Sequence, residues 1–101
     1  MTQSEKKKFR LTAKWKKFRQ KIRKLHNCRD YITGEKLLRT WNLHHICMKS
    51  ESYTDISDDS MFIPLNKETH KLVHYMFNVY KHDKTVIVKL KGVLDKMLEV
   101  N

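Results

Sequence analysis

The sequence predicts an α+β fold in which two short strands lie between amphipathic helices. Apolar side chains recur at helical spacings of three and four over residues 12–25, 67–80 and 85–99. Two other segments, 37–47 and 61–65, are typical of extended chain, and Pro64 keeps the second one short or at a sheet edge. With 101 residues the chain has the length of one domain. We therefore expect a single domain over residues 11–101, preceded by a flexible basic arm over residues 1–10.

The first helix is expected to begin after Thr12, which is a good N-cap, and to end near Leu25. Its apolar face should dock on the core through Trp15 and Phe18. The candidate nucleic-acid-binding side chains lie on the other faces: Lys14, Lys16, Lys17, Arg19, Lys21, Arg23 and Lys24. This basic surface is either solvated or lies along phosphates, and a helix on a membrane surface would show the same pattern.

The chain as a whole is strongly basic, with 22 Lys and Arg against 11 Asp and Glu, and a net charge of +11. Such a charge attracts polyanions, which are nucleic acids or anionic membranes, although a solvated basic surface without a specific partner is the plain alternative. No apolar run approaches the ~20 residues that span a bilayer, and the N-terminus has no apolar signal segment. Two cysteines favour reduced thiols over a disulfide scaffold. We expect a cytoplasmic protein without membrane association.

The second half of the chain carries a polar loop and two helices. Residues 48–60 hold the densest acidic content, including Asp58 and Asp59. Asn66 is expected to cap a helix from Lys67 to about Tyr80. A break at residues 82–84 precedes a last helix over about residues 85–99.

Four of the six histidines are arranged as a candidate metal site. His70 and His74 are four residues apart on a predicted helix, so both rings lie on one face, the spacing by which helical pairs clamp a metal. His44 and His45 are neighbours on a predicted strand and point to opposite faces. One of them can bind a metal beside the helix while the other faces a substrate. The plain alternative for the helical pair is two partly exposed histidines without a metal.

The stretch from Cys28 to His74 resembles the HNH endonucleases of the ββα-metal class, in particular the small single-domain forms of phages and prophages. The matching segments are WNLHHI, at residues 41–46, and MFIPLNKETHKLVH, at residues 61–74. The resemblance implies a β-hairpin followed by a metal-binding helix, flanked here by N- and C-terminal helices.

The same resemblance assigns the site. It implies one divalent ion, which can be Mg, Mn, Zn or Ni, held by His44, His70 and His74. It also implies that His45 is the general base that activates water. Three imidazoles would leave positions open for water and for a phosphate oxygen.

Many family members also hold a structural zinc between two Cys-x2-Cys knuckles. Here the aligned segments read CRDY at residues 28–31 and NKET at residues 66–69, so a single cysteine stands at four ligand positions. We expect no structural zinc, and we expect packing of the terminal helices to take its place.

The family's middle asparagine, which orients the base histidine, aligns with Met61. A methionine has no amide to make that hydrogen bond. Asp58, Asp59 or Asn66 is expected to support the site instead. The two aspartates are favoured, because Asn66 is already wanted as a helix cap.

The resemblance implies hydrolysis of DNA phosphodiester bonds, by nicking or by double-strand cutting, with a 5′-phosphate and a 3′-hydroxyl as products. DNA is the expected partner and RNA the alternative, while a protein partner, for example in phage packaging, is left open. Two other functions compete with this one. A non-catalytic or weakly catalytic DNA- or partner-binding module would explain Met61, and a toxin-like nuclease held by an acidic inhibitor would suit the positive charge.

Overall fold

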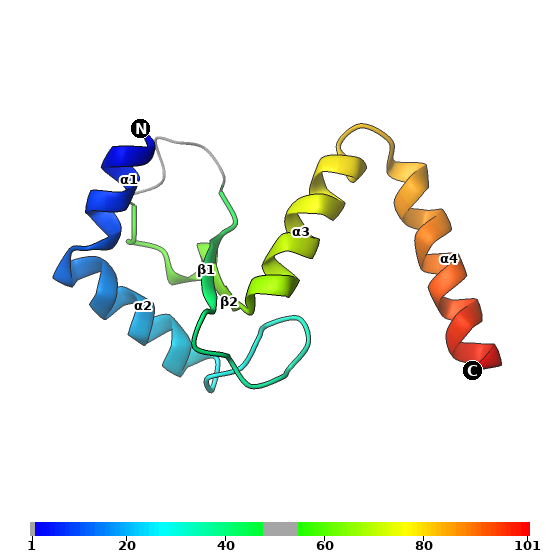
Figure 1. Ribbon diagram of the computed structural model, residues 1–101, viewed down its shortest axis with the longest axis horizontal. Helices are drawn as coiled ribbons and strands as arrows, with labels where there is room; N and C mark the ends of the chain where they lie inside the picture. Colours follow the sequence, from blue (N-terminus) through cyan, green and yellow to red (C-terminus); the bar gives the residue numbers. More distant parts are fainter. Residues whose placement is uncertain (1, 48–54) are drawn as a thin grey trace. The chain divides into compact units, whose positions relative to one another are not determined.

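The computed structural model describes residues 2–47 and 55–101. Over these residues the chain forms four α-helices and one two-stranded antiparallel sheet, which confirms the α+β class (Figure 1). The chain divides into two compact units, one ending at Thr69 and the other comprising His70–Asn101. The expectation of a single domain over residues 11–101 stays a prediction. The division falls inside one helix, which is a boundary that no change in composition marks.

The N-terminal segment is a helix where the sequence predicted a flexible arm. Helix α1 spans Gln3–Arg10 and begins with a capping box, in which Thr2 and Glu5 satisfy each other's backbone N–H groups. Near its end, the ring of Phe9 lies 5.4 Å from that of Trp15. This cap and this aromatic contact give the basic segment a local structure that its charge alone does not predict.

Helix α2 spans Ala13–Leu25 and packs on the sheet as its apolar face predicts. The Thr12 hydroxyl accepts the Trp15 N–H and caps the helix, as expected. Trp15, Phe18 and Ile22 are buried together with Phe62 of the second strand, and this group is the hydrophobic core. Phe18 and Phe62 meet edge to face at 4.8 Å, a favoured arrangement of aromatic rings.

The sheet consists of strand β1, Asn42–His45, and strand β2, Phe62–Leu65, paired antiparallel. His44 lies opposite Ile63, and His45 lies opposite Phe62. A short 3-10 turn, η2, spans Asp59–Met61 and leads into β2. The first strand is shorter than the predicted extended segment 37–47. Strand β1 begins only at Asn42, because the Trp41 N–H donates to the Leu38 carbonyl and forms a turn before it.

A hydrogen-bonded cluster around Asp30 joins residues 28–31 to residues 66–69, which are the two segments that the resemblance aligns with zinc knuckles. The Asp30 side chain is 1% exposed and accepts backbone N–H bonds from Ile32 and Thr33. It also accepts the Asn66 N–H at 2.8 Å and a bond from the Thr69 side chain. A buried carboxylate thus fixes the beginning of the next helix.

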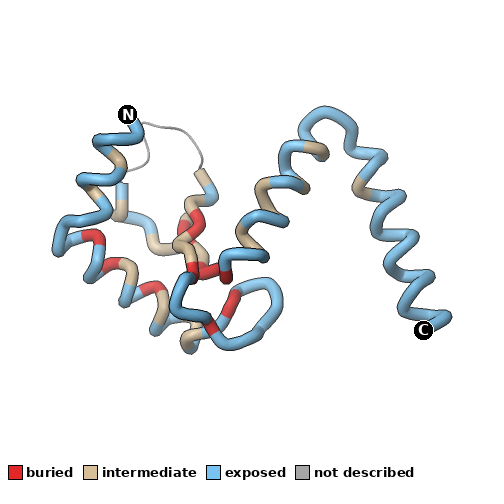
Figure 2. Tube along the Cα trace, viewed as in Figure 1, coloured by how far each residue is buried: buried red, intermediate tan, exposed pale blue. Residues whose placement is uncertain are grey.

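Helix α3 spans Lys67–Tyr80, as the sequence predicts, and helix α4 spans Lys84–Val100. Asp83 caps α4 by accepting the Thr85 N–H. No residue of α4 is buried (Figure 2). The expectation that packing of the terminal helices takes the place of a zinc site stays a prediction for α4. Within the first unit, the Asp30 cluster joins the two aligned segments. Among the described residues, no helix has the length and apolar character needed to cross a membrane.

Candidate metal centre

Strand β1 presents its two histidines in different environments. The His44 side chain is 6% exposed. His45 is half-buried, and its ring stacks on that of Phe62 with the centroids 4.4 Å apart. Because consecutive strand residues point to opposite faces, His45 leans toward the aromatic core and His44 points away from it. The two rings thus lie on opposite faces of β1, as the sequence predicted, while the roles of His44 as ligand and of His45 as base stay predictions.

Helix α3 brings His70 and His74 together. Their Nε2 atoms lie 3.1 Å apart and their ring centroids 4.6 Å apart. Burial lowers the pKa of His70, and the adjacent His74 lowers it further. A lowered pKa keeps the His70 imidazole neutral near pH 7, which is the form that can donate a lone pair to a metal.

His44, His70 and His74 form a group that is close enough to bind one metal ion, since one nitrogen from each lies within 4.8 Å of the others. The chain connection explains how this arises. His44 pairs with Ile63 of β2, and a single residue, Asn66, separates β2 from α3. The two helical histidines then follow at the first and second turns of α3.

The spacing of the three nitrogens suits a metal after a small adjustment. In a tetrahedral site with Zn–N bonds of about 2.0–2.1 Å, two ligand nitrogens are roughly 3.3 Å apart. The His70–His74 separation of 3.1 Å is already close to this value. All three separations are within 4.8 Å, so none exceeds the tetrahedral value by more than about 1.5 Å, a difference that side-chain rotation can supply.

Asp55 is a charged neighbour of His45 that the sequence analysis did not single out. Its pKa is lowered by hydrogen bonds from the side chain and the backbone N–H of Ser57, and also by the positive charge of His45. An ionised carboxylate near a base histidine stabilises the imidazolium that forms when the base takes a proton. The sequence shows that this loop is acidic, but it does not show which of the acidic residues lies near His45.

The residues expected to support the site have other contacts. Asp58 accepts two hydrogen bonds from Ser60 and caps η2, and Asp59 forms an ion pair with Lys21 at 2.9 Å. Met61 packs against the hydrophobic core. These contacts hold the turn before β2 in place, and a role for the two aspartates in orienting His45 stays a prediction.

The expectation that Asn66 caps α3 with its side chain is wrong. Its side-chain oxygen accepts the Leu38 N–H at 2.8 Å, and its amide nitrogen donates to the Lys36 carbonyl at 3.1 Å. Asn66 therefore ties the preceding loop to the start of α3. At the start of α3, the Asn66 N–H donates to the carboxylate of Asp30, which lies 36 residues earlier in the sequence.

The predicted basic surface of α2 is exposed, except at its two arginines. Arg23 is half-buried. Arg19 donates to the Trp41 carbonyl at 2.6 Å, and its guanidinium lies 3.8 Å from the centre of the Trp41 ring. Burial and the charge of Arg23 lower the pKa of Arg19. Arg19 thus holds the start of β1, which differs from its predicted use as a phosphate contact. The five lysines are exposed: Lys14, Lys16, Lys17, Lys21 and Lys24.

No protein-family model, curated protein or solved structure matches this chain.

Proposed function

We propose that this protein is a metal-dependent nuclease of the HNH type that hydrolyses phosphodiester bonds in DNA. The observation that carries the proposal is the group of His44, His70 and His74, whose nitrogens lie within 4.8 Å of one another. The order of two antiparallel strands followed directly by a histidine-bearing helix supports it, as does the net charge of +11. A basic protein with a metal site near its surface is suited to a polyanionic substrate.

In the proposed reaction, a water oxygen attacks the phosphorus and the bond from phosphorus to the 3′ oxygen breaks. His45 takes the proton of the attacking water at a ring nitrogen, and the leaving 3′ oxygen takes a proton from solvent. A divalent ion held by the three imidazoles would polarise the phosphoryl group and stabilise the leaving oxygen. Asp55 would stabilise the protonated His45 by its charge.

The exposed lysines of α2 are proposed to contact backbone phosphates. Such contacts position a protein on a nucleic acid without reading its sequence. They also make binding salt-dependent, with each neutralised phosphate adding about −0.9 to the slope of log K against log salt on duplex DNA.

The test is a nicking assay on supercoiled plasmid, with Mn²⁺ or Ni²⁺ added and with EDTA as a blank. We expect nicking that requires the metal and that falls to the EDTA level in His74→Ala. The matched control is His82→Ala, which removes a histidine outside the candidate metal group and should leave nicking unchanged.

A second candidate, a non-catalytic DNA-binding module, is favoured by the methionine at the family's asparagine position. That candidate predicts a different result in the same experiment. The protein would shift the plasmid in a gel, and no metal would produce nicked circles.

A further inference from the structure

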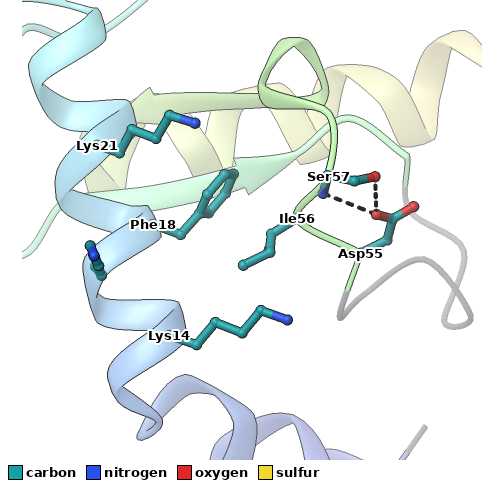
Figure 3. A pocket seen from close by; sticks show the side chains of 7 residues that line it. Lys14, Phe18, Lys21, Asp55, Ile56 and Ser57 are labelled. Carbon is teal, nitrogen blue, oxygen red and sulfur yellow. Dashed lines mark hydrogen bonds between the residues drawn. The ribbon is translucent and has the colours of Figure 1, made fainter.

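The two compact units differ in how their amphipathic helices are covered. In the first unit, Phe18 of α2 is buried in the core, and Ile56 of the facing segment packs against that core (Figure 3). In the second unit, which comprises His70–Asn101, every residue of α4 except Ile87 is exposed (Figure 2). Because large exposed apolar patches mark interaction surfaces, the apolar side of α4 is a candidate for one.

The apolar residues of α4 form one continuous face. Its central stripe has spacings of three and four residues, the heptad pattern of helices that pair: Ile87, Leu90, Leu94 and Met97. A valine row with a spacing of seven residues runs along one side of the stripe: Val86, Val93 and Val100. Lys84 and Lys91 lie along the other side. Leu94 and Met97 are 49% and 53% exposed, so the middle of this face is open to solvent.

The second unit has no core of its own, since no residue of α3 or α4 is buried and the structure describes both helices in full. It is shorter than the ~40 residues below which a domain usually needs a disulfide, a metal or association with another chain. Both cysteines, Cys28 and Cys47, lie outside it. The candidate ligands His70 and His74 lie in the first two turns of α3, so a bound metal would not cover α4. Association is the remaining means of the three.

The apolar face of α4 is complementary to itself when two copies run antiparallel. The helix spans Lys84–Val100, so its midpoint is Gly92. With the midpoints aligned, Ile87 lies opposite Met97 of the partner subunit, and Leu90 lies opposite Leu94 of the partner subunit. A two-fold axis repeats both pairs, as a symmetric dimer requires. The valine row then meets the valine row of the second copy, whereas in a parallel pair it would face the lysine side.

The charges beside the stripe suit the same arrangement. Lys91 is next to the midpoint of α4, so the two Lys91 side chains would approach each other near the two-fold axis. Each is already paired with Asp95 of its own helix, with Nζ 2.7 Å from the carboxylate. The two pairs would alternate in sign across the axis, so that each ammonium group also faces a carboxylate of the second copy. Such exposed pairs select an orientation more than they add affinity.

We propose that α4 is a dimerisation surface, which pairs antiparallel with α4 of a second copy about a two-fold axis at Gly92. The side chains of the central stripe and the valine row would bury roughly 400 Å² of apolar surface per chain. With the stems of the flanking lysines, the total approaches the ~1,000 Å² at which specific interfaces begin. We therefore expect a dissociation constant of roughly 1–100 µM. The proposal goes beyond the proposed function and does not depend on nuclease activity.

The test is sedimentation equilibrium of the full chain over a concentration series that spans this range. The protein is freed of nucleic acid and measured in EDTA, so that neither a polyanion nor a metal links two copies. We expect a reversible equilibrium between monomer and dimer. A monomer at every concentration would overturn the proposal, and would mean that the first unit or a different molecule covers α4.

Two lysine substitutions on opposite sides of α4 locate the interface. Leu94→Lys should weaken association by at least about tenfold, because it places a charge in the centre of the paired face. The matched control is Val88→Lys, since Val88 is 71% exposed and lies on the side of α4 opposite the stripe. It should leave the dissociation constant unchanged. Because α4 has no buried residue, neither variant threatens the fold of the first unit. Equal effects of the two variants would contradict the assignment of this face.

Two variants with the same change of charge test the orientation. Asp95→Lys should weaken the dimer severalfold, because it would gather four ammonium groups near the two-fold axis. Glu99→Lys changes the net charge equally, but Glu99 lies on the outer side of α4, away from the stripe. It should leave the dissociation constant nearly unchanged. A dimer that is weakened equally by both substitutions would rule out antiparallel pairing centred on Gly92.

Discussion

His45→Ala is expected to reduce metal-dependent plasmid nicking by roughly 10²–10⁴-fold, which is the usual contribution of a general base. Of the two histidines in β1, His45 is the one outside the candidate metal group, so it is the candidate for the general base. Affinity for the metal and for duplex DNA should stay nearly unchanged, since neither depends on a proton acceptor. The rates are measured at saturating metal, with binding followed separately.

The matched control for this variant is His26→Ala. His26 is a half-buried histidine of the same unit whose ring packs on Tyr31, at 5.6 Å between centroids. It should nick at the unmodified rate. A loss of less than about tenfold in His45→Ala would mean that another group activates the water.

Asp30→Ala is expected to lower the free energy of unfolding of the first unit by roughly 3–5 kcal/mol. The variant removes the acceptor of the buried Asn66 N–H and of the partly buried N–H groups of Ile32 and Thr33. Trp15 and Trp41 both lie in this unit, so urea unfolding followed by tryptophan fluorescence reports on it directly.

The control is Asp59→Ala, which breaks the surface ion pair with Lys21 and should lower the same free energy by about 1 kcal/mol or less. Equal losses in the two variants would show that the Asp30 cluster does not hold the unit together.

The pH dependence of stability follows from the same carboxylate. Burial alone would raise the pKa of Asp30, but the bonds from Thr33, Asn66, Thr69 and Ile32 outweigh it and hold this pKa below its usual value. A carboxyl group whose pKa is lower in the folded state than in the unfolded state stabilises the fold at pH values above the unfolded pKa. This stabilisation is lost as the pH falls from the unfolded pKa through the folded one. Stability should therefore drop below about pH 4, and the drop should be smaller in Asp30→Ala.

The sequence predicted the features that depend on short-range periodicity. The caps and spacings around Thr12, and the helical positions of His70 and His74, follow from rules that operate within a few residues. For the same reason α2 and α3 begin and end where the pattern places them.

The features that were missed depend on contacts between distant segments. Asn66 fits the local rule for a helix cap, yet its side chain bonds to Lys36 and Leu38, 28 or more residues earlier. Arg19 belongs to a run of cations, but stacking on Trp41 turns it inward. Asp55 was one acid among several in a loop, and only the folded chain brings its charge to His45.

The most direct measurement for the metal centre is a calorimetric titration with Zn²⁺. We expect one ion per chain, with the affinity lowered about a hundredfold or more in each of His44→Ala, His70→Ala and His74→Ala, and unchanged in His82→Ala. Affinity that stays the same in both helical variants, His70→Ala and His74→Ala, would contradict the assignment of the site.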